Sequence, residues 1–180
     1  MAQVALLLAL LLLSFPSLLL ASPRFGASVS GVAQSKEPPD MQGYQFLLNY
    51  DPDRFHWRKF NVYFDGGVSH FWVDNSTNNS TLNIYSAAPV VRYSFKKRGP
   101  VSPFLELSIG VSYLNQTRIA DRNLGIHFAF QDRLGIGAFL GKSEQFSIGI
   151  NAIHYSNAHL AHYNAGITIP LLIDIGYRFS

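Results

Sequence analysis

The sequence predicts an all-β protein, an antiparallel transmembrane β-barrel of about eight strands. From about residue 43 onward, large apolar residues alternate with small or polar residues at period two, which is the pattern of a strand with two different faces. Charged residues make up only 14% of the chain and aromatic residues another 14%, whereas soluble domains carry roughly 25% charged residues. After residue 22 no apolar stretch approaches the roughly 20 residues of a membrane helix, so any crossing has to use strands.

The N-terminal region has a different character. Residues 4–21 form an uncharged apolar run, which predicts a signal peptide over 1–21, with cleavage after Ala21 or as late as Ala33. A spanning helix interrupted by Pro16 is the alternative, since no Lys or Arg precedes the run. Residues 22–42 show no period and are expected to be a processing region or a disordered lead-in. The barrel domain is then expected over 43–180.

The strand pattern is clearest at the C-terminus, where apolar side chains occupy every second position of 171–180. The same pattern recurs at 60–69, 105–113 and 124–131, with further candidates near 43–50, 81–95, 133–140 and 145–156. The second face consists mostly of Gly, Ser, Asn and Ala, not of the Lys and Glu typical of a solvated face. Small residues suit the interior of a narrow barrel whose apolar side meets lipid. A soluble barrel that binds an apolar ligand inside is the alternative.

Composition excludes several kinds of site. The chain has no cysteine, which removes disulfides and thiol nucleophiles, and its net charge is only +3. No long basic run is present, so no nucleic-acid partner is expected. Three histidines at 154, 159 and 162 lie close together without carboxylate neighbours in the sequence, and we expect neither a metal nor another cofactor. An oligomer is possible, but no feature of the sequence supports one.

The segment 145–157 carries candidate chemistry. His154 and Ser156 share the parity of Ile148 and Ile150, so both are expected to face outward at the end of a strand. Residues i and i+2 lie about 6.6 Å apart along one face, which brings an imidazole near a hydroxyl. A histidine can take the serine proton and so create a nucleophile. The alternative is that His154 and Tyr155 are interfacial rings and that Ser156 begins a turn.

The position of this pair in the barrel adds to the argument. Acyl transfer needs donors for an oxyanion, and the candidates are Asn157 and the amides of Ala158 and His159. In an even-stranded barrel both termini are periplasmic, so the strand before the last one runs outward. His154 and Ser156 would then lie at the level of the outer leaflet, which contains lipopolysaccharide.

The sequence HisTyrSerAsnAla at 154–158, followed by Asn164, Gly166 and a final strand, resembles the PagL-type lipid A 3-O-deacylase family. GlnAspArgLeuGlyIleGly at 131–137 and the TyrArgPhe ending resemble it too. The resemblance is specific over 131–179 and looser over 43–130. It implies an eight-stranded barrel in the bacterial outer membrane, with lipid A of lipopolysaccharide as its partner. It also implies a metal-independent serine esterase that removes the acyl chain at position 3, with His154 as base, Ser156 as nucleophile and Asn157 with the adjacent amides supporting the oxyanion.

One position departs from the family. The family's third catalytic residue is a Glu about a dozen residues after the serine, and Thr168 occupies that place here. Counting back from Phe179 turns Thr168 inward, unless Pro170 introduces a bulge. Asp174 and Glu106 are also expected inward, so the sequence names no third acid. A weakened enzyme, altered chemistry or a non-catalytic barrel with a structural or binding role are the alternatives, and His159 or His162 could complete the site.

Overall fold

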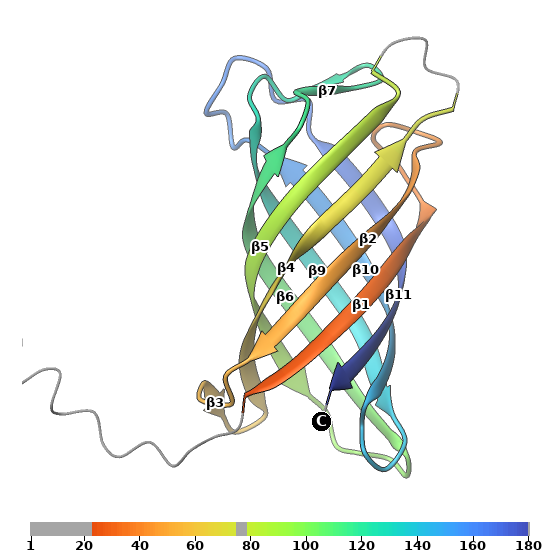
Figure 1. The fold of residues 1–180 in the computed structure, drawn as a ribbon, viewed down its shortest axis with the longest axis vertical. Coiled ribbons are helices and arrows are strands. Elements are labelled where there is room, and N and C mark those ends of the chain that lie inside the picture. The colour runs from red at the N-terminus through yellow and green to blue at the C-terminus, as the bar shows by residue number, and fades with distance from the viewer. Residues whose placement is uncertain (1–22, 75–78, 180) are drawn as a thin grey trace, which may run out of the picture.

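The computed structural model describes residues 23–74 and 79–179, and the predicted signal peptide at 1–21 lies outside them. Within these ranges, eight long antiparallel strands close into a barrel (Figure 1). They are β1 (Arg24–Gln34), β2 (Gln42–Asp51), β4 (Phe60–Trp72), β5 (Thr81–Ser94), β6 (Val101–Leu114), β9 (Phe128–Leu140), β10 (Phe146–Ser156) and β11 (Ile167–Phe179). β1 pairs with both β2 and β11, and β2 pairs with β4, so these strands leave no open edge.

Three short strands complete the architecture. β3 (His56–Trp57) pairs with the start of β4, while β7 (Arg118–Ile119) and β8 (Arg122–Asn123) form a hairpin between β6 and β9. β1 begins and β11 ends at the same end of the barrel as β3, and the β7 hairpin lies at the opposite end (Figure 1). We call these the terminal end and the loop end. In the described part of the chain, no helix is long and apolar enough to cross a bilayer.

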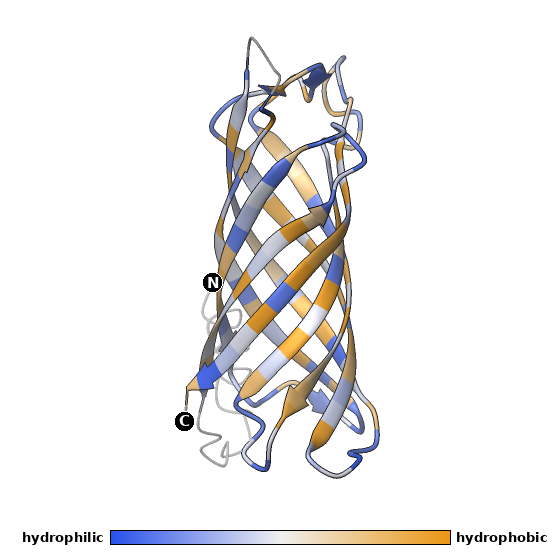
Figure 2. Ribbon diagram, turned by 90° about the vertical axis from the view of Figure 1, so that its right-hand side faces the viewer, coloured by the Kyte–Doolittle hydropathy of each residue, from blue (hydrophilic) through white to orange (hydrophobic). Residues whose placement is uncertain are grey.

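The apolar faces of the strands point out of the barrel, as predicted. Ile148, Ile150 and Ile173 have 49%, 46% and 48% of their surface exposed. The polar side chains of Gln45 and Asp65 are instead buried inside. Figure 2 shows apolar and polar positions alternating along the strands. An apolar exterior around a polar interior fits a barrel surrounded by hydrocarbon.

The interior is filled in two layers. Towards the terminal end, buried charges pair with each other: Arg92 with Glu106, and Arg133 with Asp65. Towards the loop end, the interior is closed by apolar side chains, namely Met41, Phe71, Leu82, Ile84, Leu114, Ile119, Leu124, Ala129, Ile153, Tyr155, Ile167, Ile169 and Leu172. This packed layer lies directly beneath the outer loops and supports their strand ends.

Two expectations about the strands need correction. Residues 22–42 are not a disordered lead-in, because 24–34 form β1, which closes the barrel. Cleavage as late as Ala33 would therefore cut through a barrel strand. The two strands expected at 124–131 and 133–140 are one strand, β9. The expected number of strands is confirmed, although β1 replaces one of those predicted.

Candidate active site

His154 and Ser156 lie on the outer face of β10, at the loop end of the barrel. Ile153, which precedes His154, and Tyr155, which lies between His154 and Ser156, are buried in the apolar layer. His154 and Ser156 are partly exposed. Residues i and i+2 of a strand share a face. Because Ile153 and Tyr155 point into the barrel, His154 and Ser156 point outward. The structure thus brings the two predicted side chains to one face, and the inward residues of the same strand end pack in the apolar layer.

A bulge in β11 brings Thr168 to the same face. Asn151 of β10 lies opposite Leu172, whereas Ile153 lies opposite Ile169, so β11 contains one extra residue at Pro170–Leu171. An extra residue reverses the parity of everything beyond it. Thr168 consequently faces outward directly opposite His154, and the inward orientation obtained by simple counting does not apply.

The Thr168 hydroxyl connects His154 to Glu37, a carboxylate that the sequence pattern did not predict at this site. Its Oγ1 lies 3.0 Å from Nδ1 of His154 and donates a hydrogen bond to Oε2 of Glu37 at 2.8 Å. A hydroxyl has one proton, and an ionised carboxylate can only accept. Because that proton is given to Glu37, the oxygen of Thr168 accepts the Nδ1 proton of His154. Nε2 of the ring is then the nitrogen with a lone pair.

Glu37 belongs to the loop between β1 and β2, which pairs with the start of β11. The Glu37 amide donates to the Thr168 carbonyl at 3.1 Å, and the Thr168 amide donates to the Glu37 carbonyl at 2.8 Å. Arg122 of β8 lies 3.8 Å from the Glu37 carboxylate and donates to the Gly166 carbonyl at 3.0 Å. The hydrogen bond from Thr168 lowers the pKa of Glu37, and the positive charges of Arg122 and Lys36 act in the same direction.

A second carboxylate lies on the other side of His154. Asp132 of β9 is directly opposite His154 in the β9–β10 pair, and it is exposed on the outer face. It interrupts a line of apolar side chains that includes Phe130 and Leu134. Asp132 belongs to the segment 131–137 that resembles the family, but the sequence alone predicted no place for it beside His154. Asp132 shares the outward face with Phe130 and Leu134, and a carboxylate at an outward, lipid-facing position is the sequence feature that could have pointed to it.

Asn157 is placed differently from the expected oxyanion donor. It is buried, and its side-chain amide donates to the carbonyls of Leu124 at 2.5 Å and Tyr163 at 2.8 Å. Its Oδ1 accepts the His159 amide, and its own amide donates to Asn164. The side chain of Asn157 and the amide of His159 are thus used within the loop.

Of the amides that follow Ser156, that of Ala158 makes no hydrogen bond to another described residue. It lies in a tight loop in which Ala158 and His159 have φ values of 51° and 62°. His159 and His162 are exposed and, with Arg118 and Asp121 among other residues, surround a separate hollow of about 610 Å³ on the outer loops. The His154 ring makes its hydrogen bond to Thr168, and the His162 ring packs on Tyr163, so the structure does not bring these histidines together as a site.

An apolar groove on the outer surface runs to the His154 side chain. Its volume is about 760 Å³, and it crosses five strands from β5 to β11. Apolar side chains form most of it: Pro89, Val91, Leu107, Ile109, Leu134, Ala152 and Pro170. His154, Thr168 and Asp132 supply polar groups in the same groove. The arrangement combines a place for a hydrocarbon chain with an acid–base group.

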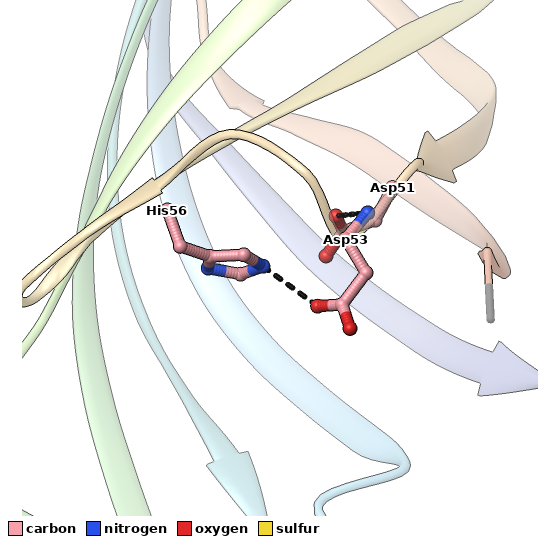
Figure 3. A group of neighbouring side chains, drawn as sticks. All are labelled: Asp51, Asp53 and His56. Carbon is pink, nitrogen blue, oxygen red and sulfur yellow. Dashed lines mark hydrogen bonds and ion pairs between the residues drawn. The ribbon is translucent and has the colours of Figure 1, made fainter. Parts of the chain in front are cut away.

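A second cluster of ionisable groups lies at the terminal end, where Figure 3 shows His56 pointing toward Asp53. Nε2 of His56 is 2.6 Å from Oδ1 of Asp53. Arg24 binds the same Asp53 oxygen at 2.7 Å and Oδ2 of Asp51 at 3.3 Å, and Asn61 donates to Asp51 at 2.8 Å. Three side chains here could ligate a metal. Arg24 nevertheless pairs with both carboxylates, so the cluster fastens the start of β1 to the turn after β2.

Comparison with known sequences gives a consistent result. The family model described as Lipid A 3-O-deacylase (PagL) matches residues 42–178. Lipid A deacylase PagL of Pseudomonas aeruginosa is 35% identical over 128 residues, which are 69% of this chain and 71% of that protein. Lipid A deacylase PagL of Bordetella bronchiseptica is 29% identical over 141 residues, or 78% of this chain and 72% of that protein.

Solved structures share the barrel. The crystal structure of the outer membrane enzyme PagL has a TM-score of 0.68 and 28% identity, covering 85% of this chain and 98% of that one. Neisserial surface protein A has a TM-score of 0.56 over 88% of this chain and 98% of that one, and at 10% identity it supports the fold alone. With its closed barrel and apolar exterior, this protein is located in the bacterial outer membrane. The chain belongs to the lipid A 3-O-deacylase (PagL) family.

Proposed function

We propose that this protein is an outer-membrane serine esterase that removes the 3-linked acyl chain from lipid A of lipopolysaccharide. Ser156 is the nucleophile and His154 the general base. One observation carries the proposal: an outward His154 and Ser156 share a strand end at the loop end of the barrel, with an apolar groove reaching the histidine. Charged and polar groups on a lipid-facing surface are unfavourable, so a cluster of them beside such a groove favours a functional role.

The reaction follows from these groups. Oγ of Ser156 attacks the ester carbonyl carbon while Nε2 of His154 takes its proton. The bond from that carbon to the sugar oxygen breaks, and His154 returns the proton to the leaving oxygen. A water then attacks the acyl–serine ester and gives one proton to His154, which passes it to Oγ as the ester bond breaks. The products are a free fatty acid and lipid A with a hydroxyl at position 3.

The negative oxygen of the intermediate needs a hydrogen-bond donor near Ser156. Removing one such donor typically lowers kcat by about 10²- to 10³-fold. The Ala158 amide is suited to the task, since the neighbouring amides of Asn157 and His159 already donate within the loop. Asn157 then supports the site by holding the loop in shape.

The groove orients the substrate and does not add hydrophobic affinity. An acyl chain in the outer leaflet already lies in hydrocarbon, so moving it along the barrel wall gains little hydrophobic free energy. A groove that ends at His154 instead fixes which ester the chain presents to the catalytic pair. Positioning of this kind can itself supply much of a rate enhancement.

The test is deacylation of lipid A by the protein in outer membranes, followed by mass spectrometry. Wild type should remove the mass of one hydroxyacyl chain, and Ser156→Ala should remove none. Ser147→Ala is the matched control, because Ser147 lies on the same strand with the opposite parity, and it should keep the activity. Unchanged lipid A with wild type, or full activity of Ser156→Ala, would contradict the proposal and favour a non-catalytic barrel.

A further inference from the structure

We propose that Glu37 is the acid of this site and that it acts on His154 through the hydroxyl of Thr168. The inference rests on the proposed serine esterase and explains how the site works with Thr168 at the position where the family resemblance implies a glutamate. Glu37 is a positioning residue in this scheme: it orients the Thr168 hydroxyl, and that hydroxyl orients the ring.

The contact between Glu37 and Thr168 is built into the backbone. The two residues exchange both of their main-chain hydrogen bonds, so the β1–β2 loop adds a bridge to the start of β11. Their side chains emerge beside each other and meet at 2.8 Å. Arg122 approaches the same carboxylate oxygen from β8 and holds the Gly166 carbonyl. Residues from the β1–β2 loop, β8 and β11 thus meet at one carboxylate. Because backbone hydrogen bonds hold two of these segments together, the side-chain contact is a fixed feature of the fold.

The relay does two of the tasks of a directly bonded acid. Because the Thr168 proton goes to Glu37, Thr168 offers His154 a lone pair, which fixes the ring proton on Nδ1 and leaves Nε2 to accept the serine proton. Without Glu37 the hydroxyl can rotate and donate to Nδ1, which stabilises the wrong tautomer. In serine proteases a wrong tautomer lowers kcat by about 10⁴-fold. The negative charge of Glu37 also stabilises the imidazolium that forms during the reaction.

Other carboxylates are less suited to this role. Glu106 pairs with Arg92 and Asp174 accepts a hydrogen bond from Ser30, both inside the barrel. Asp132 faces His154 from β9, on the side opposite to Thr168, but Nδ1 of His154 makes its hydrogen bond to the Thr168 oxygen in this structure. Asp132 is therefore the competitor that the experiment has to separate from Glu37.

The experiment measures lipid A deacylation by the full-length protein in outer-membrane vesicles. Glu37→Gln and Thr168→Val should each lower kcat by about 10- to 100-fold, less than the loss of a directly bonded acid, with KM nearly unchanged. Because both act on one relay, the double variant should be no slower than the slower single variant. Glu144→Gln is the matched control, because Glu144 is likewise a hydrogen-bonded loop carboxylate but lies at the terminal end, and it should leave kcat unchanged.

Rescue distinguishes the relay from a purely structural contact. Thr168→Glu in the Glu37→Gln background places a carboxylate directly opposite His154 and should restore most of the lost activity. If Glu37 only anchored the loop, this second substitution would not restore activity. Failure of the rescue, or additive losses of kcat in the double variant, would overturn the proposal. So would a loss of kcat in Asp132→Asn with none in Glu37→Gln.

A second readout separates this inference from the identity of the substrate. A fluorophosphonate probe labels an activated serine whatever ester the enzyme uses. Slower labelling of Ser156 in Glu37→Gln, recovered by adding Thr168→Glu, supports the relay even if wild type leaves lipid A intact, a result that would sink only the proposed substrate. Equal labelling of wild type and Glu37→Gln overturns the relay, and no labelling of wild type overturns both proposals.

Discussion

At the scale of single residues, the site depends on how the His154 ring is held. Nδ1 is fixed by Thr168, while the ring edge packs against the backbone at Gly166, which has a φ of 64°. A Cβ at position 166 would lie 3.1 Å from Cε1 and 3.6 Å from Nε2 of His154. Glycine is therefore favoured at 166 by its positive φ, and a Cβ there would press on the His154 ring.

Gly166→Ala should consequently displace the ring and lower kcat. The ring has to shift by a few tenths of an ångström, and because misplacement of a catalytic group by about 1 Å can cost about 100-fold, we expect a loss of about tenfold in the deacylation assay. The positive φ itself costs about 1–2 kcal/mol for a residue with a side chain. Gly99→Ala separates the two effects, because Gly99 has a φ of 59° with no atom near the added Cβ. Equal kcat losses in both variants would refute the steric explanation.

Single residues also show where sequence reasoning reached its limit. The outward orientation of His154 and Ser156 could be predicted, because the alternation of apolar and small residues along one strand is visible in the local sequence. Glu37 lies 131 positions from Thr168, and only closure of the barrel brings them together. Asn157 was expected at the oxyanion from its position after the serine, but the sequence cannot show that its amide binds the carbonyls of Leu124 and Tyr163.

At the scale of elements, the strands with weak patterns were the ones mispredicted. In β1 the inward residues are Gly26, Ser28 and Ser30 and the outward ones include Ala27 and Gly31, so apolar contrast is low. β9 was split because Asp132 interrupts its apolar face, and that same residue lies beside His154. A polar residue on the outward face therefore hides the continuity of a strand from pattern-based prediction.

The contact of the β1–β2 loop with β11 should depend on pH in a defined direction. Thr168, Arg122, Lys36 and His154 face the Glu37 carboxylate and lower its pKa below the usual 4.5. A lowered folded-state pKa contributes stability that is fully present above the unfolded value and is lost as pH falls through the folded value. NMR titration of the Glu37 carboxyl and the Thr168 amide should give a common midpoint below 4.5. A midpoint at or above that value would contradict the contact.

At the scale of the whole molecule, the apolar exterior determines where the protein can be stable. Ile150 lies in the middle of β10, between Ile136 and Ile173, while Phe146 begins the strand near the terminal end. Both side chains face outward and are exposed. They provide a matched pair of positions that differ mainly in depth.

A charge placed at these two positions should therefore have different effects. Ile150→Arg should lower the free energy of unfolding by about 2–4 kcal/mol, because it puts a cation near the bilayer centre, whereas Phe146→Arg near the interface should cost about 0–1 kcal/mol. Urea unfolding of the protein in lipid vesicles, followed by tryptophan fluorescence, measures both. Equal costs would mean that depth in hydrocarbon does not govern this surface.

The seam between β1 and β11 has a consequence for how the protein is assembled. The first and last strands of the barrel meet there, and the Glu37 bridge to Thr168 continues the same seam. On the proposed mechanism, a chain still in transit across the periplasm carries the serine and the histidine but has not yet assembled their acid. The esterase would thus become active only when the last strands pair during insertion, and it would not hydrolyse lipids that the unfolded chain meets earlier.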